Sequence, residues 1–288
     1  MNYCQYLSIT DFFSYISHFL DIGSFQTHPK SIPDSLAFTS QIATIHRMIP
    51  SEYESALRQL NKIFLEENLK LNLSAFREEE QSWIGNIEDS LAILDSNILE
   101  QHSSPLLPGE GPGVRSGGEN LRLIDIGTGG GFPLLPLAMC LPQCYLTGLD
   151  STNKKISAVE RIAKELSLTN VDLISGRAED LGRDPNHREQ YDLVLSRAVA
   201  GANVLLELCA PFAKVKGKIV FWKSMKIDQE LEDSLMARAE LTCHLTNQHE
   251  YELPEPFGKR QLLVFEKTSP TSDKYPRKVG EPKKKPIK

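Results

Sequence analysis

The stretch that decides the fold reads Leu121-Arg-Leu-Ile-Asp-Ile-Gly-Thr-Gly-Gly-Gly-Phe-Pro133 and continues, after a short gap, with Cys144-Tyr-Leu-Thr-Gly-Leu-Asp150. This order predicts a hydrophobic strand, a glycine-rich turn, the start of a helix, and a second strand that ends on a carboxylate. A helix N-terminus preceded by small residues lets a ligand reach backbone N–H groups that lack intrahelical partners. An acid about 20 residues beyond the glycines can accept hydrogen bonds from the two hydroxyls of a ribose. The stretch therefore indicates a pocket for a cofactor that contains adenosine.

The spacing of the glycines separates two kinds of cofactor. A dinucleotide fingerprint requires Gly-x-Gly-x-x-Gly, but Phe132 occupies the position of its third glycine. The pattern is instead Asp125-x-Gly127-x-Gly129-x-Gly131, which resembles the first motif of S-adenosylmethionine (SAM)-dependent methyltransferases. For the motif alone, a glycine-rich turn in an unrelated α/β protein is the alternative. The acid after the second strand makes that alternative less favourable.

Composition places the chain among soluble globular proteins. Its 288 residues suit one domain with an appendage, and 40% of them are hydrophobic and 24% charged. No apolar run approaches the ~18 residues of a membrane span, so we expect no membrane association. The five cysteines form no Cys-x-x-Cys pair, so we expect no metal site.

An odd number of cysteines without a clear secretory signal favours a reducing compartment. We therefore expect the protein to be cytoplasmic. A chloroplast or mitochondrion is the alternative if residues 1–50 are a transit segment. Transit peptides are rich in arginine, whereas Lys30 and Arg47 are the only lysine or arginine residues of this segment.

The chain divides into five segments. Residues 51–100 have a helical pattern, in which Leu57, Leu60 and Phe64 share one face. Three prolines and five glycines between 101 and 120 are typical of a linker or an insertion loop. The full division is a poorly ordered extension (1–50), a helical segment (51–100), the Gly/Pro-rich loop (101–120), the SAM-dependent methyltransferase domain (121–268) and a basic tail (269–288).

Strand and helix patterns alternate after the loop. Strands are expected near 121–128, 145–150, 171–176, 191–196, 217–223, 243–250 and 260–267, and helices near 133–141, 154–167, 203–213 and 228–240. This alternation predicts an α/β fold with a mainly parallel seven-stranded sheet, helices on both faces and a small helical segment before it. The resemblance of the glycine motif implies that this fold is of the class I SAM-methyltransferase (Rossmann-like) type. Ligands of such sheets bind outside the carboxyl ends of the strands. Polar or glycine-rich groups follow four strands, at Gly127–Gly131, Asp150, Gly176–Glu179 and Ser196–Arg197.

Charge is distributed unevenly along the chain. Residues 274–288 contain seven lysines and arginines against Glu281 alone, a balance of +6, while the whole chain carries −6. A basic tail on an acidic body suits contact with nucleic acid. A solvated terminus without a partner is the alternative, and the tail alone does not decide between them.

A set of motifs extends this interpretation to most of the chain. They are Asp125-Ile-Gly-Thr-Gly-Gly-Gly-Phe-Pro133, Asp150-Ser-Thr152 with Lys154-Lys155, Gly176-Arg-Ala-Glu179, Tyr191-Asp-Leu-Val-Leu-Ser-Arg-Ala198, Gly258-Lys-Arg-Gln-Leu-Leu-Val264, the upstream Asn72-Leu-Ser74 and Asn86-Ile-Glu-Asp-Ser-Leu91, and the downstream Tyr275-Pro-Arg-Lys-Val-Gly-Glu-Pro-Lys-Lys-Lys-Pro286. Together they resemble the RsmG family of small-subunit ribosomal RNA guanine-N7 methyltransferases, over roughly residues 55–286. The chain departs from that family at four positions: Asn86 stands where it usually has His, Ser74 where it has Thr, Leu134 where Gly follows Phe-Pro, and Ser224 where Gly follows the lysine matched by Lys223.

The resemblance implies an enzyme that transfers a methyl group from SAM to N7 of a guanine in 16S rRNA and releases S-adenosylhomocysteine. The implied partner is 16S rRNA or the small ribosomal subunit, and we expect a monomer. By position, the family's cofactor contacts fall on Gly127, Phe132, Ala178, Glu179 and Arg197, and we add Asp125, Gly129, Gly131, Asp150, Ser151 and Thr152. We expect Arg197 and Lys223 to take part in catalysis, and Lys154, Lys155, Arg177, Lys223 and Arg260 to contact RNA phosphates.

Three of these residues have a structural alternative. Arg197 could form a salt bridge to Asp192 or another acid at the sheet edge. Phe132 could face the core, and Asp150 could cap the helix that follows it.

The chemistry of the acceptor fits a site without a general base. N7 of guanine has an in-plane lone pair and no proton, so catalysis rests mainly on alignment of N7 with the methyl carbon and the sulfonium. Two other functions stay open. A catalytically silent homologue that binds the small subunit is disfavoured by the intact glycine motif and Asp150, and a small-molecule methyltransferase by the N-terminal helices and the basic tail.

Overall fold

The computed structural model describes residues 49, 51–99, 120–197 and 200–288. The expectations for the N-terminal extension and the Gly/Pro-rich loop concern segments that lie almost entirely outside these residues.

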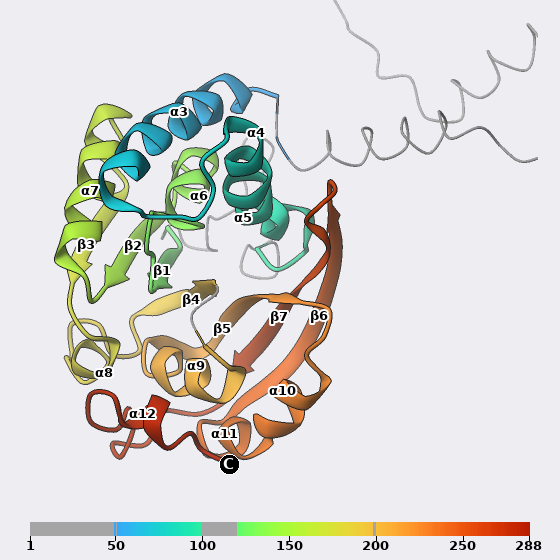
Figure 1. Cartoon of the computed structure of the whole chain (residues 1–288). Coiled ribbons are helices and arrows are strands. Elements are labelled where there is room, and N and C mark those ends of the chain that lie inside the picture. The colour runs from blue at the N-terminus through green and yellow to red at the C-terminus, as the bar shows by residue number, and fades with distance from the viewer. Residues whose placement is uncertain (1–48, 50, 100–119, 198–199) are drawn as a thin grey trace, which may run out of the picture. The chain divides into compact units, whose positions relative to one another are not determined.

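Seven strands form one sheet in the order β3-β2-β1-β4-β5-β7-β6 (Figure 1). The strands β1 to β5 pair in parallel, and β7 runs antiparallel between β5 and β6. This result confirms the predicted class and all seven predicted strands. Their bounds are β1 (Arg122–Ile126), β2 (Tyr145–Asp150), β3 (Val171–Ser175), β4 (Tyr191–Arg197), β5 (Ala213–Ser224), β6 (Cys243–Leu253) and β7 (Gly258–Lys267).

Helices connect the strands and precede the sheet. Those before it are α3 (Glu54–Leu71), α4 (Glu79–Ser82) and α5 (Asp89–Leu91), with a π-helical turn at Trp83–Glu88 and a 3-10 turn at Ala92–Asp95. The others are α6 (Leu134–Cys140), α7 (Asn153–Glu165), α8 (Ala178–Leu181), α9 (Ala202–Cys209), α10 (Asp228–Asp233), α11 (Leu235–Glu240) and α12 (Glu281–Lys284). No helix in the described ranges has the length and apolar character that crossing a bilayer requires.

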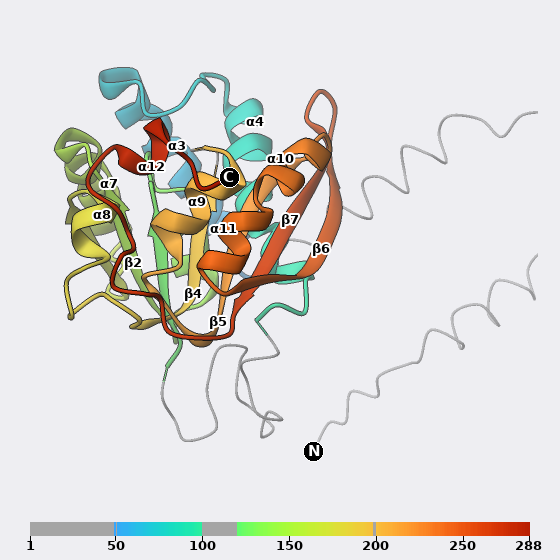
Figure 2. The ribbon, with the colours of Figure 1, turned by 90° about the horizontal axis from the view of Figure 1, so that it is seen from below.

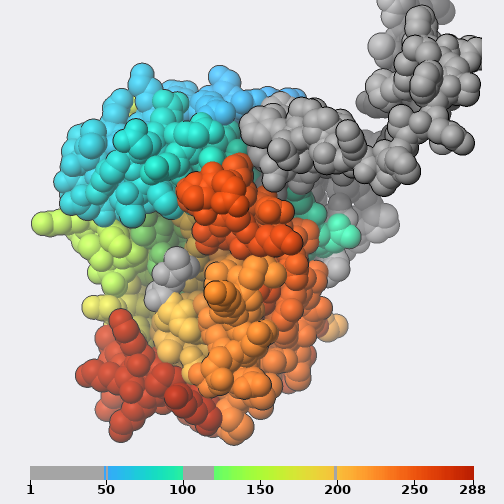
Figure 3. All heavy atoms as spheres, turned by 45° about the vertical axis from the view of Figure 1, so that its right-hand side comes forward, coloured from blue at the N-terminus to red at the C-terminus, as the bar shows by residue number. Residues whose placement is uncertain are grey.

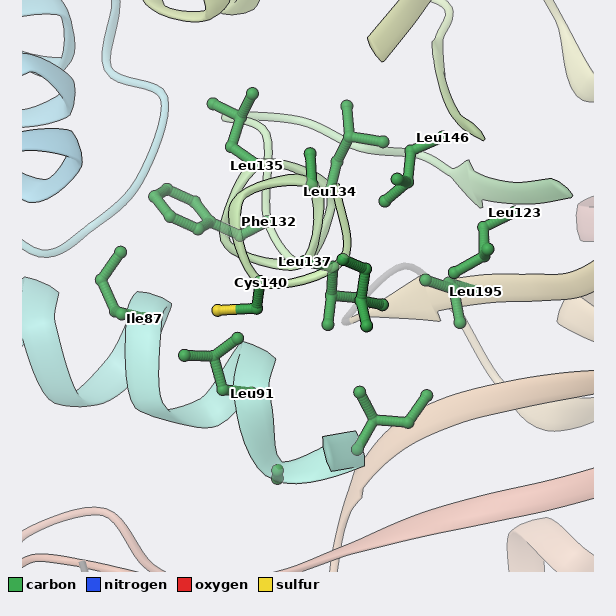
Figure 4. Packing of buried hydrophobic residues seen from close by; sticks show 14 of the residues in the cluster. Ile87, Leu91, Leu123, Phe132, Leu134, Leu135, Leu137, Cys140, Leu146 and Leu195 are labelled. Carbon is green, nitrogen blue, oxygen red and sulfur yellow. The ribbon is translucent and has the colours of Figure 1, made fainter. Parts of the chain in front are cut away.

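Alternate residues of the central strands face two separate hydrophobic cores. On β4, Leu193 and Leu195 join the core that includes α6, α7 and the N-terminal helices, whereas Val194 joins the core formed with α9 and α11. Figure 4 shows α6 between the strand residue Leu195 and two helical residues, Ile87 and Leu91. Both faces of these strands are covered, because a mainly parallel sheet must bury both.

The N-terminal helices pack on the sheet domain through the predicted apolar face. Leu57, Leu60 and Phe64 of α3 are all fully buried, which confirms that pattern. At the far end of the same helix, Glu67 accepts a hydrogen bond from Arg161 Nε of α7 at 3.2 Å. Apolar contact and an ion pair therefore hold this segment against the domain.

The expected helix over 228–240 is two helices. Ser234 separates α10 from α11, and its hydroxyl donates to the carbonyl of Leu231 at 2.7 Å. A serine side chain that bonds to the backbone in this way competes with regular helix geometry, so the single predicted helix was wrong.

The basic C-terminal segment (residues 269–288) packs against the domain. It runs along α8 and α9 and ends beyond α12 (Figure 2), and its last residues (dark red) lie next to the yellow part of the chain in the space-filling view (Figure 3). Tyr275 and Pro282 are buried. The alternative of a solvated terminus is therefore not realised, and contact of the exposed lysines with nucleic acid stays a prediction.

Candidate functional site

A cavity of about 500 Å³ opens at the carboxyl ends of β1, β2, β3 and β4. The chain passes from β1 out to β3 and then returns to β4 on the other side of β1, so the cavity lies at the switch point of the sheet. We call it the strand-end cavity. Nine of the predicted site residues line it: Gly127, Asp150, Ser151, Thr152, Lys155, Arg177, Ala178, Glu179 and Arg197.

The glycine turn after β1 forms one wall. Gly127, Gly129 and Gly131 have φ values of 80°, 58° and 91°, a region that glycine enters without steric cost. Only Gly127 of the three lines the cavity. A Cβ at Gly131 would meet Leu135 at 2.7 Å, so this glycine permits close packing of α6 instead.

Asp150 ties the turn to the end of β2 and faces the cavity. Its carboxylate accepts hydrogen bonds from the Thr152 amide at 2.8 Å and the Gly129 amide at 3.1 Å. An ionised carboxylate has about four acceptor positions, so about two remain for hydroxyl groups of a ligand. The cap residue of α7 is Thr152, two residues beyond Asp150. The capping alternative is therefore wrong for Asp150 itself.

Asp125 lies beneath the turn and does not line the cavity. It is 1% exposed, and neither carboxylate oxygen has a hydrogen-bond partner of good geometry among the described residues. Thr128 and the Leu134 backbone are its polar neighbours, and burial raises the pKa of this carboxyl to about 7. The position suits a residue that supports the turn from below.

Arg197 ends β4 and is held by the N-terminal helices. Its guanidinium donates to the Gly85 carbonyl at 2.8 Å, to Asp89 Oδ2 at 2.9 Å and to Asn86 Oδ1 at 3.1 Å. The salt-bridge alternative is thus realised with Asp89, and Asp192 pairs with Lys214 instead. Because Arg197 also lines the cavity, the ion pair and a ligand contact are compatible.

Asp89 is the centre of a buried polar network that the sequence did not single out. Its second carboxylate oxygen accepts from the Tyr251 hydroxyl at 2.6 Å, and its carbonyl accepts from Trp222 Nε1 at 2.7 Å. Burial and the neighbouring carboxylate raise the pKa of Tyr251, so this phenol remains a donor. In the sequence, only the motif Asn86–Leu91 pointed to this region. That motif does not indicate which strand residues Asp89 contacts.

The remaining predicted residues lie outside the cavity. Phe132 packs edge-on against Phe64 with ring centroids 4.7 Å apart, so its ring faces the core. Lys223 Nζ forms an ion pair with Glu230 at 2.5 Å and donates to the Ala200 carbonyl at 2.8 Å. Arg260 is half-buried on β7, and Lys154 is exposed at the start of α7.

The strand-end cavity fits an adenosine-containing ligand in both size and chemistry. Its polar part holds Asp150 and the Gly127 turn, whereas Leu149, Ala178 and Leu205 supply apolar surface for a purine. Within the described ranges, no group of three or more His, Cys, Asp and Glu side chains is placed to hold a metal ion.

Three further lining residues, Gly280, Pro282 and Lys283, come from the C-terminal segment. The Gly280 amide donates to Glu179 Oε1 at 2.9 Å across a separation of 101 residues. Sequence reasoning missed them, since no spacing or motif connects the two ends of this contact.

The chain has extensive relatives among known proteins. A family described as rRNA small subunit methyltransferase G matches residues 53–253. A ribosomal RNA small subunit methyltransferase G from Alkaliphilus metalliredigens is 40% identical over 226 residues, which cover 78% of this chain and 87% of the relative. One of the same name from Streptococcus equi is 41% identical over 226 residues, 78% of this chain and 88% of the relative. Among solved structures, a SAM-dependent methyltransferase from Aquifex aeolicus is 16% identical and has a TM-score of 0.40 over 51% of this chain and 82% of that chain.

Proposed function

The chain belongs to the rRNA small subunit methyltransferase G family, and from this premise we propose that it transfers the methyl group of SAM to N7 of a guanine in 16S rRNA. The observation that carries the proposal is the strand-end cavity, which brings Gly127, Asp150 and Arg197 together from three neighbouring strands. Family membership supplies the class of substrate, and the cavity supplies a place for the cofactor.

SAM supplies a methyl group activated by its sulfonium. Asp150 would accept hydrogen bonds from the ribose hydroxyls with the acceptor positions that its backbone contacts leave free. The Gly127 turn allows close approach of the amino-acid part, because no side chain projects from that position. Ala178 and Leu205 would flank the purine.

The protein needs to align the acceptor base, not to deprotonate it. Because N7 carries a lone pair and no proton, positioning accounts for most of the rate acceleration. Arg197 must leave this lone pair free, although guanidinium groups favour the O6/N7 edge of guanine. Methylation makes the purine cationic, and the ion pair with Asp89 lessens the repulsion that Arg197 would exert on that charge.

Lys223 would position the site and not touch the substrate. Its ammonium group is bound to the carbonyl of Ala200, a residue that lines the cavity, and to Glu230. We therefore propose that Lys223 positions Ala200 at the edge of the cavity.

We further propose that the enzyme acts as a monomer, in the cytoplasm, on rRNA or the small subunit. An organelle stays the alternative through residues 1–50, which lie almost entirely outside the described part of the chain.

Methyl transfer to rRNA from a strain that lacks the gene tests the function. Naked 16S rRNA and isolated small subunits are each incubated with SAM and the purified protein, and 7-methylguanosine is mapped by mass spectrometry. We expect one modified guanine in the small-subunit RNA. SAM binding without any transfer to either RNA substrate would instead favour the catalytically silent subunit-binding protein.

A further inference from the structure

The C-terminal segment supplies one side of the strand-end cavity. Its residues Gly280, Pro282 and Lys283 line the same space as Gly127 and Asp150. Pro282 is buried, whereas Lys283 is exposed beside it. The cavity is therefore closed on this side by the last part of the chain.

An ion pair between the half-buried Arg277 and the buried Glu207 fixes this segment in place. The Arg277 guanidinium donates to both carboxylate oxygens of Glu207, from Nε at 2.8 and 3.1 Å, and the Arg277 amide donates to Glu207 Oε1 at 2.9 Å. Glu207 is fully buried in α9. Charge-assisted contacts to both oxygens restrict orientation as well as distance.

Arginines from the loop after α8 hold the preceding residues. Arg188 donates to the Tyr275 carbonyl at 3.0 Å and to the Thr271 carbonyl at 2.6 Å. Arg183 donates to the Pro276 carbonyl at 2.5 Å. These contacts place the start of the segment, so that Gly280 reaches Glu179.

The contact between Gly280 and Glu179 lies on the purine side of the cavity. Asp150 marks the ribose position at the end of β2, and Ala178 and Glu179 follow the next strand outward. Pro282 belongs to α12, which packs against α9, and Leu205 and Leu208 of α9 line the same cavity. Together these apolar side chains suit the face of a purine.

We propose that residues 280–283 form the purine-side wall of the cofactor site, so that the basic C-terminal segment is a cofactor-binding element. The inference rests on the proposed function for the identity of the cofactor. It assigns to the segment a role that its charge does not suggest, since Gly280 and Pro282 are uncharged.

Titration calorimetry with S-adenosylhomocysteine (SAH), without RNA, tests the wall. A chain truncated after Val279 keeps Tyr275 and Arg277 but loses the wall, and we expect its affinity for SAH to fall about tenfold or more. The full-length Pro282→Asp variant places a carboxylate in the wall and should lose affinity to a similar extent. Its matched control is Pro286→Asp, since Pro286 does not line the cavity.

A second pair of variants tests the contribution of charge. Lys284→Ala removes the same charge as Lys283→Ala at a position outside the cavity, so affinity for SAH should fall only in the Lys283 variant. Thermal unfolding without ligand checks that each variant is folded. Full-chain affinity in both the truncated protein and folded Pro282→Asp would overturn the proposal, and loss of RNA binding in the same proteins would then make the segment an RNA contact only.

The two proposals fail in different ways. If the intact chain binds SAH and Pro282→Asp weakens this binding, yet no rRNA is methylated, the proposal for residues 280–283 is supported and the proposed function is wrong. If the intact chain binds neither SAM nor SAH, the cofactor assignment and the wall fall together.

Discussion

The two sides of the strand-end cavity are built in different ways. On one side, Gly127 and Asp150 follow consecutive strands, and hydrogen bonds within this region hold the turn, such as that from the Gly129 amide to Asp150. On the other side, Arg197 is held by Asp89, which lies 108 residues earlier in the sequence. Pro282 is placed indirectly, because nearby Arg277 binds Glu207, 70 residues earlier. Local backbone geometry determines the first side, whereas buried ion pairs between distant segments determine the second. Mutations on the two sides should therefore fail in different ways.

A charge in the glycine turn should have the largest effect. Gly129→Asp places a carboxylate next to Asp150, which accepts the Gly129 amide hydrogen. We expect SAH binding to fall below detection by calorimetry while the protein stays folded, because a Cβ here meets no atom closer than the Gly127 oxygen at 3.8 Å. Gly129→Ala is the control, since it adds the Cβ without the charge. Equal loss in both variants would show that backbone strain, and not charge, is responsible.

Removal of Asp89 should disturb the cavity at Arg197, because it removes the ion pair that holds this arginine. Asp89→Ala leaves Arg197 without its carboxylate partner, and loss of one member of a buried pair costs about 3–5 kcal/mol of unfolding free energy. Asp89→Asn keeps an acceptor for Tyr251, so we expect it to fold and to lower kcat about tenfold to a hundredfold through misplaced Arg197. Urea denaturation and steady-state kinetics measure the two effects.

The control for this pair lies at the opposite end of β4. Asp192→Asn breaks the pair with Lys214 far from the cavity, so it should lower stability and leave kcat unchanged. A drop in kcat of the same size in this control would mean that Asp89 acts only through stability.

The same contrast explains what the sequence could predict. The strands were predicted because residues such as Leu193, Val194 and Leu195 alternate between two cores within one hydrophobic run. Gly127 and Asp150 were predicted because a positive φ and a strand-terminal acid each leave a local pattern. The pair of Asp89 and Arg197 leaves none, since neighbours across 108 residues are brought together only by folding.

Local chemistry alone does not reveal which partner each charge finds within the fold. Lys223 is a cation near the end of a strand, which predicts phosphate contact, and in the structure it pairs with Glu230 of α10. The seven cations after residue 273 suggested a solvated or RNA-bound tail. Arg277 is instead used to fix that segment to the buried Glu207. Which charges stay free depends on partners that sequence spacing does not reveal.

The buried carboxylate beneath the turn should make stability depend on pH. Asp125 has a pKa of about 7 in the folded protein against an ordinary value of 3.8. Between these values the folded state holds a proton that the unfolded chain has released, so this group lowers stability as pH rises towards 7. Between pH 5 and pH 8, the free energy of unfolding of Asp125→Asn should therefore increase by roughly 3 kcal/mol relative to that of the unsubstituted protein.

Chemical denaturation of both proteins across this pH range measures the difference between their free energies of unfolding. The titration of all other groups cancels in this difference. A constant difference between the two proteins would mean that Asp125 titrates near its ordinary value. Such a result would place water or another donor against its carboxylate.

Two adjacent lysines of α7 should show the smallest effect and sharpen the boundary of the cavity. Lys155 lines it, while Lys154, one residue earlier, is exposed and lies outside it. We expect Lys155→Ala to weaken SAH binding about threefold and Lys154→Ala to leave it unchanged, since an exposed charge contributes little at that distance. For RNA, each lysine that contacts a phosphate should reduce the slope of log affinity against log salt by ~0.7 on single strands. Filter binding of small-subunit rRNA at four salt concentrations measures this slope, and calorimetry with SAH measures the other effect. If Lys154→Ala weakened SAH binding as much as Lys155→Ala, general charge around the mouth would control affinity, and the cavity boundary drawn between these two residues would be wrong.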